Sequence, residues 1–499
     1  MCRSSSRSMF WRRRRARKCE GGVWGNVEHG MWNVRRVRAD MVGPEVHGPG
    51  VHLENAIPHS AADASHPGKD FFDDPHFAPS VFVTADIAGV GGVIKQRPED
   101  FLVEEIPLYE PVGEGEHIYM LVEKRGLSTT ELVSILASHF GVRGRDVGYA
   151  GMKDKNAITR QVMSIHAPGK TPEDFPELRD QRISVLWTDL HVNKLRRGHS
   201  AGNRFSIRIR GVSVGDAPKA LESMRRLARE GVPNRTGEQR FGVRMNNHIV
   251  GRLLLLGQNR EALDALLGTG DGRSGLMDEE ARSLYERGAY DEALRASRYL
   301  GRVEKSALRA LSRGLSPSRV VRSIDSNQRF FYITAFQSAV FNRVLDERIA
   351  RGELGVMLEG DVAWRHDDNA CFLVDAPTLA APSLAERVAK IEVSPTGPLW
   401  GAKMMRAGAE PGRLEEAALE ATGVTMKDLV SFSHRTGDPL TGARRPLRVP
   451  LGDPDIEAGV DEHGAFIRCA FDLPAGAFAT VVMREIMKPA DGRIEAEGS

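Results

Sequence analysis

The chain has 499 residues, of which 41% are hydrophobic and 27% are charged, and its formal net charge is only +2. This length and composition suit a globular protein with two or three hydrophobic cores, and they exclude collagen-like, coiled-coil and wholly disordered chains. The charge is unevenly divided, because residues 1–40 carry a net charge of +8 and residues 41–499 a net charge of −6. If the body binds a polyanion, it must do so through a local basic patch.

Residues 1–75 form a basic leader that we expect to be unstructured. The run Arg12–Lys18 is strongly basic, but no apolar segment follows it, so it is not a secretory signal. Gly, Pro, His and Ser dominate residues 42–75, and no periodic pattern appears before Val81. A mis-assigned start, an organelle transit peptide and an arm that adds non-specific RNA affinity remain open alternatives for this leader.

From Val81 the sequence predicts an α+β domain with a mixed, mostly antiparallel sheet. Ser128–Glu131 matches a capping box ahead of a helix, and Ala217–Glu230 predicts a second helix. Short segments of alternating or strand-like character predict the strands, and they lie at 93–97, 101–105, 118–123, 147–166, 183–188 and 205–211.

The region from about 243 to 440 is different, because it is rich in long amphipathic segments. The clearest are Arg252–Leu267, Asp278–Arg298 and Ile333–Ile349. Strand-like character resumes after residue 443, which indicates a domain inserted into a discontinuous one. We therefore predict a leader at 1–75, a discontinuous domain at 76–242 and 441–490, an inserted helix-rich domain at 243–440, and a tail at 491–499.

The richest segment for chemistry is residues 148–161, where Asp154 lies between Lys153 and Lys155. If the backbone is extended there, the two lysines share one face and the aspartate points to the other. Nearby positive charge lowers the pKa of a carboxyl group, which suits a nucleophile or an ion-pair partner better than a proton donor. Taken alone, these three residues favour the alternative of a solvated turn without a role.

A local basic patch is predicted at residues 191–211, which contain six Lys or Arg and no acidic residue. Basic side chains position a phosphodiester backbone without reading its sequence, and an interleaved aromatic ring can stack on an unpaired base. Phe205 is such a ring, although its alternation with polar residues fits core packing better. We assign the following residues of this patch to RNA binding: Lys194, Arg196 and Arg197.

The loop at 231–242 contains Pro, Asn and three Gly, and its Gln239 and Arg240 present planar donors that suit a phosphate or a base edge. An ordinary inter-domain loop would look similar. Four widely spaced cysteines, with no H-E-x-x-H or zinc spacing, predict no metal site. There is no phosphate-binding loop motif either, so we expect chemistry without a metal or a cofactor.

Taken together, these segments resemble the TruD family of tRNA pseudouridine synthases. The resemblance spans about residues 93–487 in family order, so chance agreement is implausible. The motifs that carry it lie at 95–105, 113–117, 151–161, 194–205, 233–242, 336–342, 360–361, 395–401, 444–446 and 473–485.

The resemblance implies a pseudouridine synthase catalytic domain with a TruD-specific insertion. The implied reaction converts a uridine of tRNA, at position 13 in characterised bacterial members, to pseudouridine without cofactor or metal. Asp154 falls on the catalytic aspartate, and Lys95 on a basic position near the active site. The positions that match contacts to the target nucleotide are Phe101, Asn203, Phe205 and Phe478.

We expect Lys153, Lys155, Gln239 and Arg240 to contribute to RNA binding as well. The expected partner is tRNA, with no membrane, since no window approaches the roughly 18 apolar residues of a membrane span. No protein partner is implied, and we expect a cytoplasmic monomer. One departure from the family is that Arg235 and Thr236 replace two aromatic residues, which makes Arg235 a candidate for a phosphate contact instead.

Two mechanisms remain open for a single carboxylate. It either attacks the sugar or the base covalently, or it removes a proton from the sugar 2′ carbon to give a glycal. A glycosidase would ordinarily need a second carboxylate as proton donor. A non-catalytic RNA-binding protein and a nucleoside hydrolase are the competing functions, and each leaves the ordered set of motifs unexplained.

Overall fold

The computed structural model describes the following residues: 35–36, 81–270, 278–437, 440–489 and 494. They divide into two compact units, and the first holds Thr84–Val232 and the described residues from Pro450 onward, with the short strand β1 (Arg35–Arg36). The second unit holds Pro233–Val449 and the three residues before Thr84. The chain therefore leaves the first unit after Val232 and returns to it at Pro450, whereas the sequence placed these boundaries at 242 and 441.

Long-range hydrogen bonds explain why the segment after Val232 belongs to the second unit. The Asn234 side chain donates to the carbonyl of Pro446 at 2.9 Å. Arg235 forms an ion pair with Asp346. Both partners lie far away in sequence, so local pattern alone could not place the boundary.

A nine-stranded sheet forms the centre of the first unit in the described residues, with the order β1-β14-β15-β7-β2-β5-β3-β6 and with β4 paired to β5. Every pair is antiparallel except β2 with β5, so the predicted α+β fold with a mostly antiparallel sheet is confirmed. The remaining strand bounds are β2 (Phe101–Pro107), β3 (His117–Arg125), β4 (Val147–Tyr149), β5 (Ile158–His166), β6 (Ile183–His191), β7 (Ser200–Arg210), β14 (Gly452–Asp461) and β15 (Gly464–Pro474).

Two expectations about strands need correction. The predicted strand at 93–97 is reduced to an isolated bridge between Val93 and Arg210, because Lys95 adopts a left-handed backbone with φ 59°. The leader, which we expected to be unstructured, contributes β1, and Arg35 pairs with Ala458 of β14. The other residues of the leader lie outside the described part of the chain.

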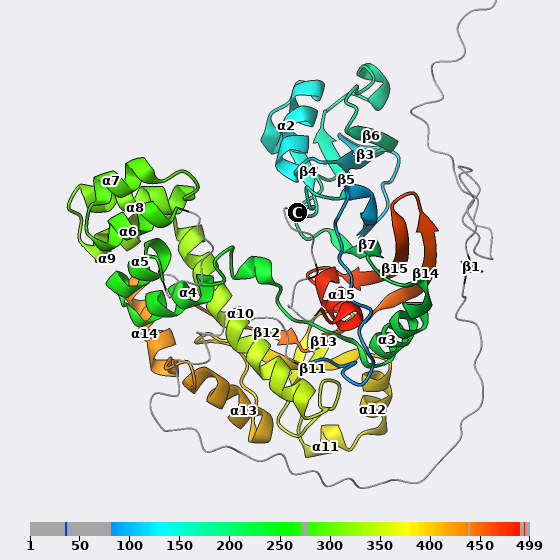
Figure 1. The fold of residues 1–499 in the computed structure, drawn as a ribbon. Coiled ribbons are helices and arrows are strands. Elements are labelled where there is room, and N and C mark those ends of the chain that lie inside the picture. The colour runs from blue at the N-terminus through cyan, green and yellow to red at the C-terminus, as the bar shows by residue number, and fades with distance from the viewer. Residues whose placement is uncertain (1–34, 37–80, 271–277, 438–439, 490–493, 495–499) are drawn as a thin grey trace, which may run out of the picture. The chain divides into compact units, whose positions relative to one another are not determined.

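Helices cover the sheet of the first unit at both ends (Figure 1). Helix α2 (Thr129–Phe140) lies beside β4 and β5, and Leu132 and Leu136 are fully buried in the core that it shares with them. Its predicted capping box is present, because the Glu131 N–H donates to Ser128 Oγ at 3.2 Å and the Ser128 N–H donates back at 2.7 Å. Helices α3 (Ala217–Glu230) and α15 (Ala479–Met487) pack against each other beside β14.

The second unit is built around α10 (Ser326–Ala350), whose buried residues join two apolar cores. The long amphipathic segments before it are each split by a glycine with a left-handed backbone, Gly257 (φ 75°) and Gly288 (φ 76°). The helices are α4 (Asn247–Leu256), α5 (Asn259–Leu267), α6 (Glu279–Glu286), α7 (Tyr290–Ala296), α8 (Arg302–Ser312), α9 (Pro317–Ser323), α11 (Ala376–Leu379), α12 (Pro382–Ala389), α13 (Ala409–Glu420) and α14 (Met426–Thr436).

The second unit also contains a four-stranded sheet, in the order β10-β9-β11-β12, and the sequence pattern did not predict its first three strands along the chain. Its strands are β9 (Val362–Arg365), β10 (Cys371–Leu373), β11 (Val393–Leu399) and β12 (Ala443–Pro446). Strands β9 and β10 have four residues or fewer, so they show too little alternation to be recognised. Two further strands, β8 (Val232–Pro233) and β13 (Arg448–Val449), lie where the chain passes between the units.

Candidate active site

Asp154 lies on the loop between β4 and β5, and its neighbours fix this loop in place. The Lys153 N–H donates to Thr129 Oγ1, in the first turn of α2, at 2.9 Å. Lys124 of β3 donates from Nζ to the Asp154 carbonyl at 2.8 Å. The Asn156 N–H donates to Asp154 Oδ1 at 3.0 Å, which closes a tight turn around the carboxylate. The loop is therefore ordered before any substrate binds.

The Asp154 carboxylate forms an ion pair with Lys95, whose Nζ lies 2.8 Å from Oδ2. The Lys95 side chain is only 6% exposed and the Asp154 side chain is 31% exposed, so the carboxylate is the accessible partner. The Lys95 ammonium also lies 4.9 Å from the centroid of the Phe101 ring. Three residues that the resemblance assigned to the active site thus meet at one point.

Opposing effects set the pKa of the Asp154 carboxyl group. Burial alone would raise it, but the hydrogen bond and charge of Lys95 outweigh that effect, with help from the Asn156 N–H and the charge of Lys124. The pKa therefore lies below its ordinary value, and Asp154 is ionised at neutral pH. The direction agrees with the sequence prediction, but Lys95 and Lys124 supply the charge rather than the two flanking lysines.

Lys124 is fully buried next to this carboxylate. Burial lowers the pKa of its ammonium to about 8, against the favourable charges of Asp154 and Glu131. It also donates to the carbonyl of Leu127. One cation therefore bonds both to the segment just before α2 and to the Asp154 loop. The sequence did contain a signal for its burial, because Lys124 lies on β3 two residues after the buried Val122 and therefore on the same face of the strand.

Lys153 and Lys155 have different surroundings, and this corrects the expectation that they share one face. The Lys153 side chain is 7% exposed, and its Nζ lies 3.0 Å from the Glu105 carboxylate and 2.5 Å from Asn203 Oδ1. Lys155 is exposed and pairs with Glu131 at 3.4 Å. Lys153 is therefore engaged inside the protein, which contradicts a role as a surface contact for phosphate, whereas Lys155 retains an accessible ammonium.

Glu105 is a residue of this cluster that the sequence reasoning missed. Its side chain is 1% exposed, and it accepts the Val162 N–H at 3.3 Å as well as pairing with Lys153. Burial raises the pKa of its carboxyl group, against the opposing charge of Lys153. The signal was present in β2, where Phe101, Val103 and Glu105 alternate inward.

The remaining predicted nucleotide contacts lie on the same unit. Asn203 is half-buried on β7. Its side chain contacts Lys153, the residue that precedes Asp154. Phe205 is 7% exposed, and its ring packs 5.6 Å from that of Phe471, as the core-packing alternative expects. Phe478 is half-buried and precedes the first residue of α15.

The basic run at 191–211 is divided in the folded protein. Its strand half is paired with carboxylates from distant segments: Arg204 with Asp472 at 2.7 Å, Arg208 with Asp461 at 3.9 Å, and Arg210 with Asp100 at 2.6 Å. Its loop half keeps accessible cations, since Arg196 and Arg197 are exposed. Arg197 donates to Tyr149 OH at 2.8 Å, and Lys194 donates to the Arg145 carbonyl.

Gln239 and Arg240 lie in the second unit, on the 3-10 turn Glu238–Arg240. Gln239 is exposed, whereas Arg240 is half-buried over the Phe331 ring at 5.2 Å, and burial lowers the pKa of its guanidinium. Arg235, proposed as a phosphate contact, is 6% exposed and paired with Asp346, so its charge is already satisfied.

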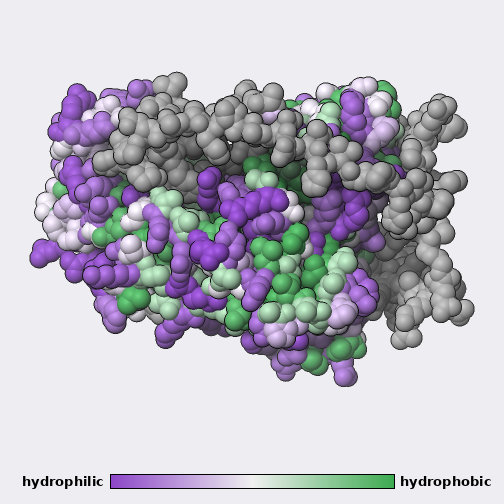
Figure 2. Space-filling view, turned by 90° about the horizontal axis from the view of Figure 1, so that it is seen from below, coloured by the Kyte–Doolittle hydropathy of each residue, from purple (hydrophilic) through white to green (hydrophobic). Residues whose placement is uncertain are grey.

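In the described part of the chain no helix is both long and apolar enough to cross a membrane. Hydrophobic residues on the face drawn in Figure 2 occur in separate groups among hydrophilic ones. The same described residues hold no group of three or more His, Cys, Asp or Glu arranged to bind a metal ion.

Comparison with known proteins gives one consistent result. Residues 80–486 match the family model for tRNA pseudouridine synthase D (TruD). A tRNA pseudouridine synthase D of Geobacter metallireducens is 43% identical over 408 residues, which covers 82% of this chain and 97% of the relative. The corresponding protein of Geobacter sulfurreducens is 43% identical over 417 residues, with coverages of 83% and 98%.

The fold agrees with a solved structure. A crystal structure of a TruD chain from Methanosarcina mazei superposes with a TM-score of 0.71 at 26% identity. The match covers 82% of this chain and 96% of that one.

Proposed function

Because the chain belongs to the TruD family of tRNA pseudouridine synthases, we propose that it isomerises uridine 13 of tRNA through Asp154. The observation that carries this proposal is an ionised carboxylate, 31% exposed, held 2.8 Å from a buried lysine beside an aromatic ring. The isomerase activity itself follows from the family, and the position of the uridine and the role of the aspartate are the proposal.

The reaction breaks the N1–C1′ bond of the uridine and forms a C5–C1′ bond, while C5 loses a proton and N1 gains one. No atom enters or leaves overall. Because the uracil never departs, a second carboxylic acid that protonates a leaving group is not required, in contrast to a glycosidase. One carboxylate next to a retained base is sufficient.

Both open mechanisms require Asp154 in its ionised form, as a nucleophile at the nucleotide or as a base at C2′. Lys95 supplies this condition by stabilising the charge. The fixed loop supplies a second condition, because a carboxylate already held by Asn156 needs little reorganisation to react.

Asn203 is proposed to hold the uracil while it rotates. A lysine ammonium can only donate, so the contact with Lys153 makes Oδ1 of Asn203 the acceptor and leaves its NH₂ group to donate. The uracil carbonyls are acceptors that match this donor. Phe101 and Phe478 are proposed to offset the few kcal/mol that unstacking the uridine costs.

The same proposal covers the organisation of the chain. The helix-rich second unit is proposed to be an insertion into the catalytic domain, and one chain to act as a monomer on one tRNA. Lys155, Lys194, Arg196 and Arg197 of the first unit, with Gln239 and Arg240 of the second, are proposed to contact the RNA backbone.

The decisive test replaces Asp154 with asparagine, which keeps shape and removes the charge. We expect Asp154→Asn to abolish pseudouridine formation on a tRNA transcript, mapped by carbodiimide adduct and primer extension, and to leave tRNA affinity near the wild-type value. Asp216→Asn, at a half-buried aspartate before α3 that pairs with Lys219, is the matched control and keeps activity. Product from Asp154→Asn would overturn the catalytic role.

Two further readings of the same assay test the rest of the proposal. A transcript with cytidine at position 13 should yield no product, and modification of another uridine in it would contradict the proposed position. Free uracil released by the wild-type enzyme would instead indicate a hydrolase.

A further inference from the structure

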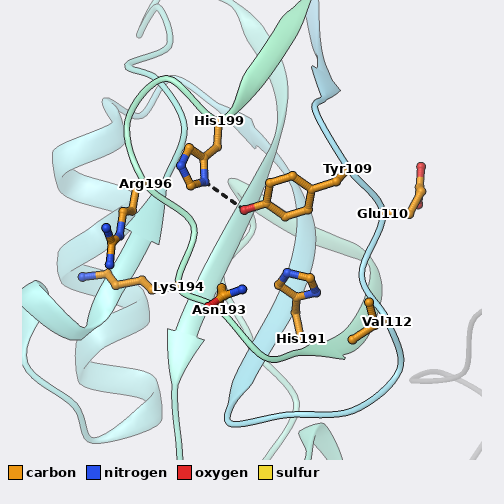
Figure 3. Close-up of a pocket in the computed structure, with 8 residues that line it drawn as sticks. All are labelled: Tyr109, Glu110, Val112, His191, Asn193, Lys194, Arg196 and His199. Atoms are coloured by element: carbon orange, nitrogen blue, oxygen red, sulfur yellow. Dashed lines mark hydrogen bonds between the residues drawn. The ribbon is translucent and has the colours of Figure 1, made fainter.

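A cavity of about 480 Å³ lies in the first unit at the end of β3 that is remote from Asp154 (Figure 3). Lys124 and Arg125 at the end of β3 neighbour the Asp154 loop, whereas His117 at its start pairs with His191 of the cavity. At about 3.3 Å per residue, the nine residues of β3 separate the two places by roughly 25 Å. The cavity is lined by Tyr109, Glu110, Val112, His191, Asn193, Lys194, Arg196 and His199.

Aromatic rings form the base of this cavity. Tyr109 stacks on His191, with ring centroids 5.2 Å apart and planes at 23°. Its hydroxyl shares a hydrogen bond with His199 Nδ1 at 2.8 Å, drawn in Figure 3. The Tyr119 ring lies 4.8 Å from that of His191, and its hydroxyl donates to the Asn193 carbonyl at 2.9 Å. The rings are therefore held in place without a ligand.

His191 carries an unsatisfied polar atom. It is 6% exposed, and its Nδ1 has no hydrogen-bond partner among the described residues. Burial lowers the pKa of the His191 imidazole, so the ring is neutral at neutral pH and offers one donor and one acceptor. A buried polar atom without a partner is costly, and a ligand that reaches it would remove that cost.

The rim combines positive charge with apolar surface. In Figure 3 Lys194 and Arg196 stand on one side of the rings, and Glu110 and Val112 on the other. Arg196 is exposed, and Val112 is 57% exposed. Flat rings, an unsatisfied ring nitrogen and cations on one side match the base and the phosphate of a nucleotide.

We propose that this cavity holds an unpaired nucleotide of the RNA substrate, distinct from the target uridine, with its base on Tyr109 and its phosphate between Lys194 and Arg196. The proposal rests on the proposed tRNA substrate. The volume suits one nucleotide, since small-ligand sites enclose about 300 to 1,000 Å³. Two anchor points roughly 25 Å apart would fix the register of the RNA on the enzyme.

The test compares Tyr109→Leu with Tyr109→Phe on two substrates. Loss of a stacked base costs on the order of tenfold or more in affinity. We expect Tyr109→Leu to raise KM for full-length tRNA about tenfold, with kcat unchanged, and Tyr109→Phe to have a much smaller effect. Tyr299→Leu, at a tyrosine of the second unit that is 70% exposed, is the matched control.

The second substrate is a short hairpin that carries the target uridine alone. The hairpin lacks the second nucleotide, so Tyr109→Leu should have little effect on its KM. The truncation should therefore cost the wild type more affinity than it costs the variant. Equal losses for Tyr109→Leu on both substrates would overturn the proposal, because a general folding defect acts on both.

Photocrosslinking identifies the occupant. With 4-thiouridine in the transcript, we expect adducts on the peptide that contains His199 to map to a nucleotide other than the target uridine, and adducts at the target would overturn the proposal. Inhibition by free uridine monophosphate that Tyr109→Leu abolishes, without any effect of this variant on tRNA, would assign the cavity to a mononucleotide instead.

Failure of this inference is distinguishable from failure of the proposed function. If Asp154→Asn abolishes product but Tyr109→Leu changes no KM, only the second site is lost. If the wild type modifies no tRNA at all, the crosslinking experiment still reports on RNA in the cavity.

Discussion

Basic side chains have opposite surroundings at the two ends of β3. Near Asp154, Lys95, Lys124 and Lys153 are all buried and bonded to oxygen atoms. At the cavity, Lys194 and Arg196 stand at the rim and Arg196 is exposed. Buried, paired charges hold a fixed geometry for chemistry, whereas exposed cations give salt-dependent affinity for a flexible polyanion. Burial of the basic side chains therefore distinguishes the two places, and it matches the proposed division between catalysis near Asp154 and RNA binding at the cavity.

The largest effect should come from breaking the buried pair of Lys153 and Glu105. Lys153→Met leaves the carboxylate without its counter-ion, and loss of one partner of a buried pair costs about 3 to 5 kcal/mol of unfolding free energy. An acid whose pKa is higher folded than unfolded loses stability as the pH rises, so this loss should be larger at pH 8 than at pH 5. Urea denaturation at both pH values measures it.

A double variant separates the structural role from the functional one. Glu105→Met with Lys153→Met removes both charges and should recover most of the stability. Activity should stay low, because the Asn203 amide has lost the donor that fixes its orientation. Full recovery of activity would show that the cluster serves stability alone.

The next effect tests the cation that keeps Asp154 ionised. Lys95→Gln removes the charge that lowers the pKa of Asp154 and shortens the hydrogen-bonding side chain, while burial continues to raise the pKa. The acid limb of the pH profile of kcat/KM should therefore move to higher pH. Lys155→Gln, at the exposed lysine next to Asp154, is the control and should leave the limb unmoved. Equal shifts in both variants would contradict the contrast between buried and exposed lysines.

A smaller effect is expected at the loop cations. Charge reversal at Arg196 and Arg197 should weaken tRNA binding and reduce the slope of log K against log salt by about 2. Arg204→Gln, in the strand half of the same run, should leave the slope near wild type because Asp453 and Asp472 already neutralise it. The measurement is a titration of tRNA binding at salt concentrations between about 50 and 200 mM. An unchanged slope in the double variant would remove the loop from the RNA path.

The smallest effect should follow removal of the leader. A chain that begins at residue 76 loses β1, a strand of two residues, and should keep its activity within about twofold. Loss of catalysis or of tRNA affinity would place part of the binding surface in the basic leader rather than in the loop at 194–197.

The sequence predicted what depends on local pattern. The capping box at Ser128, the β-rich and helix-rich regions and the basic run could each be recognised from a short window. It could not predict which of these charges remain accessible. Arg204, Arg208 and Arg210 meet acids from β14, β15 and the turn before β2, and these partners are up to 268 residues away.

The candidate site shows the same limit. Family resemblance identified Lys95, Phe101 and Asp154 as candidate site residues, and in the structure Lys95 contacts both of the others. It did not identify Glu105 or Lys124. Both are charged residues at buried positions of strands in which buried and more exposed residues alternate. Such residues are unfavourable in a core unless they are paired, so a charge at an inward position is itself a signal for a polar cluster.

Lys95 has a further consequence through its left-handed backbone, φ 59°. A conformation of this kind costs an L-residue about 1 to 2 kcal/mol, and glycine would adopt it freely. Glycine has no ammonium to offer Asp154, and asparagine, which tolerates the same backbone, is too short to replace a lysine. Glycine at position 95 should therefore raise the stability of the fold and remove the ammonium that Asp154 needs. Selection for heat resistance alone would favour an inactive variant at this position.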